Sequence, residues 1–206
     1  IILQAIQRGD DWRLASASAF GKAGSKGNGG AMRVAPLGAW FADDLDLVVT
    51  EASASAAVTH AHPEGRAGAV AVALAAAVAA QQRGNPPRQA AQAIRDEVLR
   101  RTPAGETREG IARAFQLADV GPEEAAKVLG SGFLVTAPDT VPFAIWSATR
   151  HLDNYSEAIV DTIAGDGDCD TNCAIVGGIV SLYVGMDGIP AVWRAAREQF
   201  TIGVLP

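Results

Sequence analysis

The sequence has few of the residues that bind zinc or build a disulfide framework. Only two cysteines, Cys169 and Cys173, and three histidines occur in 206 residues. A disulfide framework needs more cysteines, so we expect two reduced thiols in a cytoplasmic protein. A zinc site needs about four soft ligands at short regular spacing, and the sequence does not supply them. These two classes of small stabilised domain are therefore excluded.

The sequence also lacks an excess of positive charge. Its 17 Lys and Arg residues are outnumbered by 23 Asp and Glu residues, the net charge is −6, and no basic block occurs. Nucleic acids and anionic membranes need a basic face, so neither is expected as the main partner. The charged stretches 92–101 and 106–113 are interpreted as solvent-facing helix surfaces.

Long apolar runs and alternating β-type patterns are scarce. The run "AGAVAVALAAAVAA" at 67–80 is shorter and richer in alanine than a membrane span of about 20 residues, and it predicts a buried helix. Apolar residues elsewhere recur at helical spacing. A chain of this length buries roughly 70% of its unfolded surface, so we predict one all-α domain over 1–206. The predicted helices are 1–8, 11–20, 32–42, 45–58, 66–83, 88–101, 107–118, 122–129, 142–151, 155–164, 171–184 and 190–199.

The beginning of the chain has an apolar helical pattern without a cap. Ile1, Ile2, Leu3 and Ile6 follow this pattern, and no N-cap residue precedes them. The first residue is also not Met. We therefore expect this chain to be the later part of a longer protein, truncated at its N-terminus.

Three carboxylates crowd into the stretch "AGDGDCDTNC" at 164–173. Asp166, Asp168 and Asp170 alternate there with small residues. At a spacing of ~6 Å, neighbouring carboxylates repel by roughly 0.7 kcal/mol in water and by about 3 kcal/mol at an effective dielectric of about 20. The cluster is therefore either solvated or neutralised by a cation.

Spacing alone leaves two interpretations of this acidic stretch. An EF-hand is excluded, because Thr171 and Gly177 stand where that motif needs Gly and Glu. A helix that begins near 171 would place Asp168, Asp170 and Thr171 at its N-terminus, where hard oxygen donors suit Mg²⁺, Mn²⁺ or Ca²⁺. Alternatively, one aspartate caps that helix and the others are solvated.

The stretch "GSKGNGG" at 24–30 is rich in glycine and precedes a predicted helix. It is not a P-loop, because Lys26 does not follow the last glycine, and it is not a dinucleotide fingerprint, because Met32 replaces the third glycine. Its backbone, with Ser25 and Asn28, is suited to aim N–H groups at a phosphate or a sugar. A plain glycine turn is the alternative.

Two histidines lie in "VTHAHPEGRAG" at 58–68. His60 and His62 are two residues apart and point to different sides, so they are not expected to share a zinc ion. We expect a neutral imidazole that donates to a ligand oxygen, or a histidine that caps a helix.

These stretches, in this order, resemble the ADP-ribosylglycohydrolase family. The strings that carry the resemblance are "GSKGNGGAMRVAPLG", "THAHPEGRAGA", "LGSGFLVTAPDTVPFAIW" and "GDCDTNCAIVGGIVSLYVG", and together they extend over nearly the whole chain. The resemblance implies an all-α orthogonal multi-helix bundle with a binuclear Mg²⁺ or Mn²⁺ site in a cleft. It also implies a hydrolase that cleaves the glycosidic bond between ADP-ribose and an acceptor.

The resemblance assigns site residues as well. It makes Asp168, Asp170 and Thr171 metal ligands and leaves Asp166 outside the ligand set. It implies that the glycine loop holds the distal ribose and the diphosphate, and that Phe133 lies near the adenine. The implied substrate-binding residues are Ser25, Lys26, Gly27, Asn28, Gly29, Met32, His60 and Phe133. On this basis Asn28→Ala should weaken ADP-ribose binding and leave the fold intact.

The family pattern also contains residues that this sequence lacks. A Thr-Asp-Asp motif, which supplies the other half of the metal site, and the catalytic acid or base are expected in an N-terminal segment. Asp43 and Asp44 follow the glycine loop and are interpreted as a solvated pair at a helix end. The expected partner is an ADP-ribose conjugate such as an ADP-ribosylated protein. The alternative is a non-catalytic ADP-ribose-binding or crystallin-like structural member of the same fold.

Overall fold

Helices form the regular structure of this chain. The computed structural model describes residues 2–117 and 120–198, and within these ranges it contains helices and no strand. The predicted all-α class is therefore confirmed. In chain order the helices are α1 (Ile2–Gln7), α2 (Trp12–Ala17), α3 (Ala19–Lys22), α4 (Gly29–Met32), α5 (Ala35–Trp40), α6 (Leu45–Ala57), α7 (Pro63–Gln81), α8 (Pro87–Arg101), α9 (Glu106–Gln116), α10 (Pro122–Leu129), α11 (Ala137–Arg150), α12 (Tyr155–Ala164), α13 (Cys169–Val184), the short 3₁₀ helix η1 (Met186–Gly188) and α14 (Ala191–Ala196).

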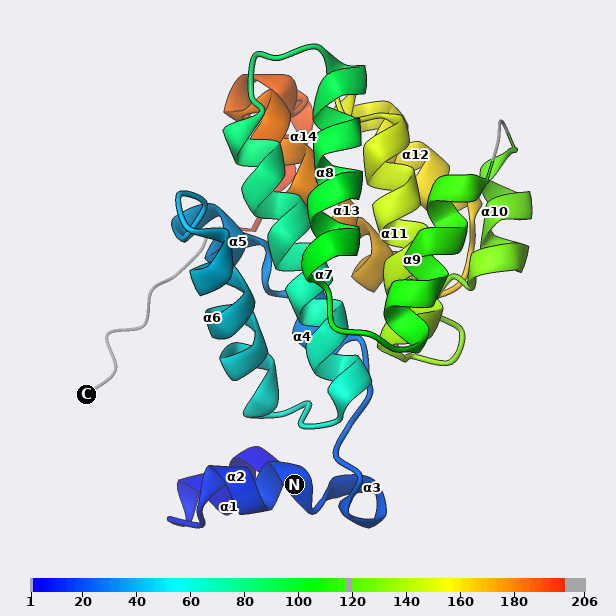
Figure 1. The fold of residues 1–206 in the computed structure, drawn as a ribbon. Helices are drawn as coiled ribbons and strands as arrows, with labels where there is room; N and C mark the ends of the chain where they lie inside the picture. The colour runs from blue at the N-terminus through cyan, green and yellow to red at the C-terminus, as the bar shows by residue number, and fades with distance from the viewer. Residues whose placement is uncertain (1, 118–119, 199–206) are drawn as a thin grey trace.

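The central helix of the bundle is α7, which packs against α4, α5, α6, α8, α11 and α13 (Figure 1). Its small side chains let neighbouring helices approach closely. A Cβ atom on Gly38 of α5 would lie 2.2 Å from the carbonyl oxygen of Ala73, and one on Gly68 would lie 2.6 Å from the Cβ of Ala137. By length and composition α7 is able to cross a membrane, but 78% of its apolar window is buried inside the fold. It is the core helix that the apolar run predicts.

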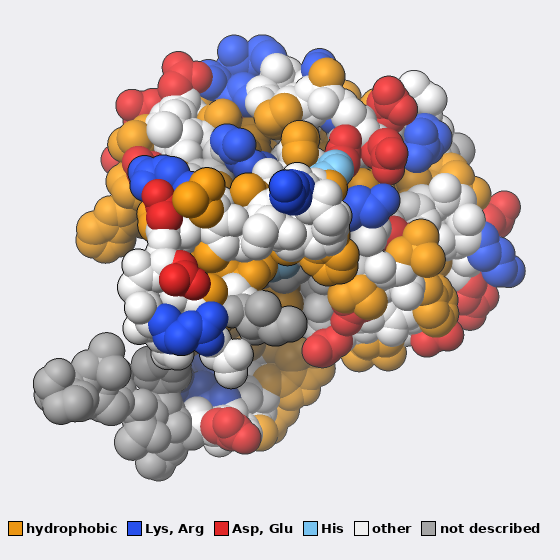
Figure 2. Space-filling view, turned by 90° about the horizontal axis from the view of Figure 1, so that it is seen from below, with side chains coloured by type: hydrophobic (Ala, Val, Ile, Leu, Met, Phe, Trp, Pro, Cys, Tyr) orange, Lys and Arg blue, Asp and Glu red, His pale blue; other side chains and the backbone are white. Residues whose placement is uncertain are grey.

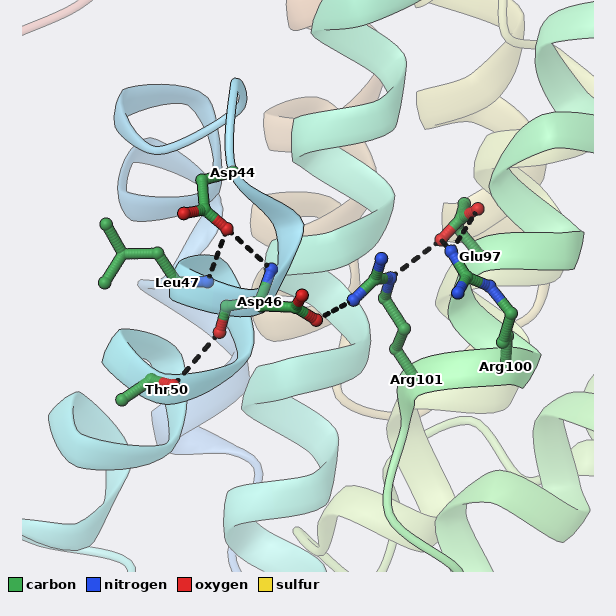
Figure 3. Close-up of polar contacts among 7 residues, drawn as sticks. All are labelled: Asp44, Asp46, Leu47, Thr50, Glu97, Arg100 and Arg101. Atoms are coloured by element: carbon green, nitrogen blue, oxygen red, sulfur yellow. Dashed lines mark hydrogen bonds and ion pairs between the residues drawn. The ribbon is translucent and has the colours of Figure 1, made fainter.

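A polar network joins α8 to α6 on the outside of the bundle (Figure 3). Arg101 donates to Glu97 at 2.8 Å and also pairs with Asp46 of α6. Asp44 lies exposed at the start of α6, where its carboxylate accepts hydrogen bonds from the backbone N–H groups of Asp46 and Leu47. Asp44 is thus a helix cap at the surface, in keeping with the solvated pair expected there.

Several predicted helix boundaries were wrong, chiefly beside proline and glycine. α11 begins at Ala137 and contains Pro142, which was predicted to start the helix. Pro142 is accommodated because α9 presents Gly110 to its ring, and a Cβ atom at Gly110 would lie 2.6 Å from the proline Cγ. The predicted helices 11–20 and 32–42 are each divided in two, the first at Ser18 and the second at Arg33–Val34. The predicted helix ends at residues 1, 118 and 199 lie outside the described residues.

The helices α1, α2 and α3 lie together beneath the bundle in the view of Figure 1. A kink at Phe20 and Gly21, whose φ angles are 51° and 68°, turns the chain within α3. The segment that follows rises to the bundle and becomes the glycine loop. The path of the chain thereby brings Phe20 next to the glycine loop.

Candidate functional site

The glycine loop forms one wall of a cavity of about 670 Å³. All of residues 24–29 line it, together with His60 and His62, and the opposite wall is Leu134, Val135 and Thr136. Its volume lies within the roughly 300–1,000 Å³ of small-molecule sites. The structure therefore brings together six of the eight predicted substrate-binding residues, namely Ser25, Lys26, Gly27, Asn28, Gly29 and His60.

The glycine loop is held against the start of α7 by two close backbone approaches. A Cβ atom on Gly24, whose φ is +75°, would lie 2.6 Å from the backbone nitrogen of His62. A Cβ atom on Gly65 of α7 would lie 2.7 Å from the carbonyl oxygen of Ser25. Side chains at either position would force the loop away from the helix, so glycine is required on both sides of the contact.

Backbone hydrogen bonds tie the same loop to the segment before α11. Asn28 donates from its backbone N–H to the carbonyl oxygen of Val135 at 3.3 Å, and Ala137 donates to the carbonyl oxygen of Lys26 at 2.9 Å. Gly27 and Thr136 form an isolated antiparallel bridge between these bonds. The two walls of the cavity are thus fixed to each other through the backbone.

His60 lies with its imidazole against the glycine loop. Cβ atoms on Gly27 and Gly29 would come within 3.3 Å and 3.1 Å of its ring. Thr59 Oγ1 is 2.8 Å from Nδ1 of His60. Burial and the nearby Arg33 guanidinium lower the pKa of His60 below its ordinary value of 6.5. The imidazole is therefore neutral at neutral pH and able to donate or accept a hydrogen bond at the cavity wall.

His62 is the capping histidine of the two. Its Nδ1 accepts a hydrogen bond from the backbone N–H of Glu64 at 3.1 Å, which places His62 at the N-cap of α7. The next residue, Pro63, occupies the first helical position, where a missing N–H leaves no bond unmade. This local pattern explains why α7 begins at Pro63, three residues before the predicted start.

Asn28 connects the glycine loop to the acidic stretch. Its side chain is 3% exposed and donates to Thr140 Oγ1 at 3.0 Å and to Asp168 Oδ2 at 2.6 Å. The sequence predicted a residue that could be replaced without harm to the fold. The structure instead shows a buried polar link between three segments, so loss of this side chain must also affect stability.

Asp168 stands at the N-cap position of α13, in a turn that two glycines make possible. A Cβ atom on Gly167, whose φ is +82°, would lie 2.2 Å from the carbonyl oxygen of Ser131, and one on Gly132 would lie 2.5 Å from the Cβ of Asp168. Ser131 accepts hydrogen bonds from the Asp168 backbone at 2.9 Å and from Asn172 Nδ2 at 2.7 Å. These contacts fix the acidic stretch beside residues 131–140.

The electrostatics of Asp168 favour its charged form. Partial burial would raise its pKa, but hydrogen bonds with Asn28, the Asp170 carboxyl and Thr171 outweigh that effect, and the pKa lies below its ordinary value. Asp170 is exposed in the first turn of the helix, and Thr171 is buried beside it. Two carboxylates and a hydroxyl therefore meet at the start of α13, a donor set that suits a hard divalent cation.

This oxygen-donor set is too small to complete a metal site by itself. Among residues 2–117 and 120–198, no group of three or more His, Cys, Asp and Glu side chains is placed to hold a metal ion. Asp166 does not join Asp168 and Asp170, because it is exposed with a φ of 58° and lies in a separate surface hollow. A divalent cation held by Asp168, Asp170 and Thr171 would need further ligands.

Two predicted substrate-binding residues lie outside the cavity. Met32 ends α4, and its Sδ lies 3.8 Å from the hydroxyl of Thr171, so it contacts the acidic stretch behind the loop. Phe133 is 71% exposed and lines the surface hollow that contains Asp166. Leu134 and Val135 line the cavity instead. The sequence analysis did not predict these two residues as part of the site. The one feature that could have indicated them is that they form an apolar pair in the irregular stretch after "LGSG".

The two cysteines, Cys169 and Cys173, lie on either side of Asp170 and Thr171 in α13. Both are free, partly buried thiols. Burial first, and then the nearby Cys169 and Asp170, raise the pKa of Cys173 to about 11. A thiol with so high a pKa is protonated and weakly nucleophilic at neutral pH, which gives Cys173 no nucleophilic role here.

Figure 2 shows the lower face of the molecule, with Lys and Arg side chains interspersed among Asp, Glu and hydrophobic side chains. Lys26 brings a positive charge to the cavity wall itself. The positive charge at the cavity therefore comes from Lys26 of the glycine loop and not from a broad basic surface.

Comparisons with known proteins show which family this chain resembles. The ADP-ribosylglycohydrolase family model matches residues 2–204. The chain is also similar to ADP-ribosylhydrolase ARH3 of Homo sapiens, with 28% identity over 100 residues, and of Gallus gallus, with 31% identity over 100 residues. Each match covers 44% of this chain and 27% of the relative. The matched part thus spans about a quarter of the length of these curated relatives.

Proposed function

The chain belongs to the ADP-ribosylglycohydrolase family, and on that premise we propose that it serves divalent-metal-dependent hydrolysis of ADP-ribose conjugates. The bond cleaved would be the glycosidic bond between ADP-ribose and an acceptor such as a protein side chain. The observation that carries the proposal is the pair of hydrogen bonds from Asn28 to Thr140 and Asp168. They join the cavity wall directly to the oxygen donors of α13.

The glycine loop supplies the binding part of the proposed site. Its backbone lies in the cavity wall without side chains at Gly27 and Gly29, so a diphosphate can approach it closely. Lys26 offsets the negative charge of that group. His60 offers a neutral imidazole for a ribose hydroxyl or phosphate oxygen. These contacts lie away from the bond to be cleaved, and their energy can be used to orient the reacting ribose.

Asp168, Asp170 and Thr171 would hold the metal, as Mg²⁺ or Mn²⁺. When bound, such ions orient ribose hydroxyls and lower the pKa of a bound water, which suits a bond that breaks through an oxocarbenium-like state. Asn28 holds Oδ2 of Asp168 and thereby fixes the orientation of the carboxylate. A binuclear site needs further carboxylates, and we propose no general acid or base among the described residues.

One observation favours a second function, non-catalytic binding of ADP-ribose. The described residues line a cavity, but among them no group of three or more His, Cys, Asp and Glu side chains is placed to hold a metal ion. A chain with this set of residues would bind the ligand without cleaving it. The crystallin-like structural alternative has less support, because a purely structural protein has no need of clustered aspartates.

The experiment is a paired measurement on the chain with added Mg²⁺ or Mn²⁺. ADP-ribose binding is measured by calorimetry, and ADP-ribose release from an ADP-ribosylated peptide is measured by chromatography. Metal-dependent release that is lost in Asp168→Asn and kept in Asp166→Asn, the exposed neighbour, supports the hydrolase. Binding without release supports the second function. Absence of ADP-ribose binding contradicts both.

A further inference from the structure

A second cavity, of about 540 Å³, lies between α8, the end of α9 and α11. Three arginines line it: Arg88 and Arg95 of α8, and Arg150 at the end of α11. Trp146 and Leu117 are among the other residues that line it. It shares no lining residue with the cavity of the glycine loop. The sequence suggested only a solvated charged face in this part of α8.

The two cavities lie at opposite ends of α7. The glycine loop packs at the N-terminus of α7, through Gly65, whereas α8 begins just after the C-terminus of α7 (Figure 1). α7 has 19 residues, which corresponds to a length of about 28 Å. The arginine cavity is therefore a site of its own and not an extension of the proposed ADP-ribose site.

The positive charge of this cavity is incompletely neutralised. Within residues 2–117 and 120–198, neither Arg88 nor Arg95 forms an ion pair. The carboxylate of Glu97, on the same helix, is bound by Arg100 and Arg101 (Figure 3). Arg150 lies 3.8 Å from Asp161, whose same oxygen also contacts His151 at 2.7 Å. Among the described residues, Asp161 is thus the carboxylate that pairs with an arginine of this cavity, and Asp96 of α8 accepts a hydrogen bond from the cavity-lining Gln92 at 2.8 Å.

The start of α8 adds positive potential to the same wall. Its N-cap residue is Pro86, which makes no capping hydrogen bond, and no acidic residue lies in the first turn. A 15-residue helix without a cap presents unpaired N–H groups and the positive end of its dipole. Arg88 stands in that first turn, where a basic residue is ordinarily unfavourable. A bound anion would remove this conflict.

Two of the guanidinium groups are held in place by aromatic rings. Arg95 lies 5.3 Å above the ring of Phe115, and Arg150 lies 5.3 Å above that of Trp146. The Nε of Arg95 is buried and has no hydrogen-bond partner among the described residues. A buried N–H without a partner is costly. Pre-positioned guanidinium groups bind planar and tetrahedral oxyanions with paired hydrogen bonds.

We propose that this cavity binds the phosphate group of a small anion. Arg95 and Arg150 would donate to its oxygens, and Arg88 with the start of α8 would complete the positive surroundings. The cavity is larger than a phosphate ion, so a phosphomonoester with a small organic group also fits the space. Inorganic phosphate and a phosphomonoester share the same recognition chemistry.

The test is a calorimetric titration of the chain with inorganic phosphate and, separately, with glycerol 3-phosphate, in a buffer of low ionic strength. We expect saturable binding of at least one of them. Arg95→Gln should weaken it by about tenfold or more, since a charge-assisted hydrogen bond is lost. Arg88→Gln, at an exposed position, provides a second variant if Arg95→Gln does not fold. Tighter binding of the ester than of phosphate would show that the ligand carries an organic group.

Two controls separate this site from other cationic sites. Arg100→Gln removes the same charge from the opposite side of α8 and should leave phosphate binding unchanged. Lys26→Gln alters the glycine-loop cavity and should also leave it unchanged, whatever it does to ADP-ribose binding. Absence of saturable binding overturns the proposal. Equal weakening in Arg100→Gln, or loss in Lys26→Gln but not in Arg95→Gln, overturns it as well.

Discussion

Asn28 donates a 2.6 Å hydrogen bond to Asp168, a residue 140 positions away in the chain. This bond, and a second one to Thr140 at 3.0 Å, connect the glycine loop with the first turn of α11 and with the start of α13. The relationship links three chain segments that are far apart in the sequence. It also means that the loop which would bind the ligand orients a carboxylate which would bind the metal.

Replacement of Asn28 by alanine should reduce both stability and binding. The change leaves the buried Thr140 hydroxyl and the Asp168 carboxylate without their common donor, which costs about 1–3 kcal/mol of unfolding free energy. The pKa of Asp168 should rise because one hydrogen bond to its charged form is lost. Denaturant unfolding and calorimetry with ADP-ribose check the two effects. Asn85→Ala, at an exposed position, is the control, and equal stability of Asn28→Ala and wild type would refute the role of Asn28.

A methyl group at Gly29 should displace His60. The Cβ atom of an alanine there would lie 3.1 Å from the imidazole, inside the ordinary contact distance. We expect Gly29→Ala to weaken ADP-ribose binding by several fold, with a shift of the His60 ring signals in NMR spectra. Gly121→Ala is a matched control, since its Cβ atom meets nothing within 4 Å and its φ is −73°. Unchanged affinity in Gly29→Ala would mean that the loop does not contact the ligand.

His60 should make stability depend on pH in the mildly acidic range. Its pKa is lowered in the folded state, so near the ordinary value of 6.5 the unfolded chain binds more protons than the folded one. Stability is therefore fully present above about pH 6.5 and falls as the pH drops through 6.5 toward the folded-state pKa. His60→Gln should show a smaller loss between about pH 7 and pH 5. An NMR titration midpoint at or above 6.5 for His60 would contradict this prediction.

Glu64 should stabilise the fold by capping a helix other than its own. Its carboxylate accepts hydrogen bonds from the backbone N–H of Glu106 at 2.9 Å and from the backbone N–H and hydroxyl of Thr107 at 2.9 and 2.7 Å. Glu64→Ala should lower the unfolding free energy by about 2 kcal/mol, and Glu64→Gln by less, because one acceptor oxygen remains. Glu123→Ala, exposed on α10, should have little effect. If both alanine variants unfold at the same denaturant concentration, the capping role is wrong.

Much of the fold could be predicted from local sequence. The apolar run at 67–80 identified the core helix, and helical spacing identified the all-α class. What local patterns did not reveal were contacts that depend on a distant partner. Pro142 lies within α11 because Gly110 of another helix makes room for its ring. Glu64 caps α9 from α7, and nothing near Glu64 in the sequence indicates this contact.

The candidate site shows the same division. The residue types of the glycine loop and the acidic stretch indicated their chemistry, and the family resemblance selected among the alternatives. Their mutual placement came only from the structure, through Asn28. The cavity wall contributed by Leu134 and Val135 was likewise not indicated by any motif, and Val135 there has a φ of 54°.

The most direct test of the account is the affinity for ADP-ribose, measured by calorimetry with and without Mn²⁺. If the glycine loop and the acidic stretch form one site, Mn²⁺ should tighten ADP-ribose binding, because each ligand favours the arrangement that the other needs. This coupling should disappear in Asp168→Asn and persist in Asp166→Asn. Absence of ADP-ribose binding, or a coupling that survives in Asp168→Asn, would contradict the account.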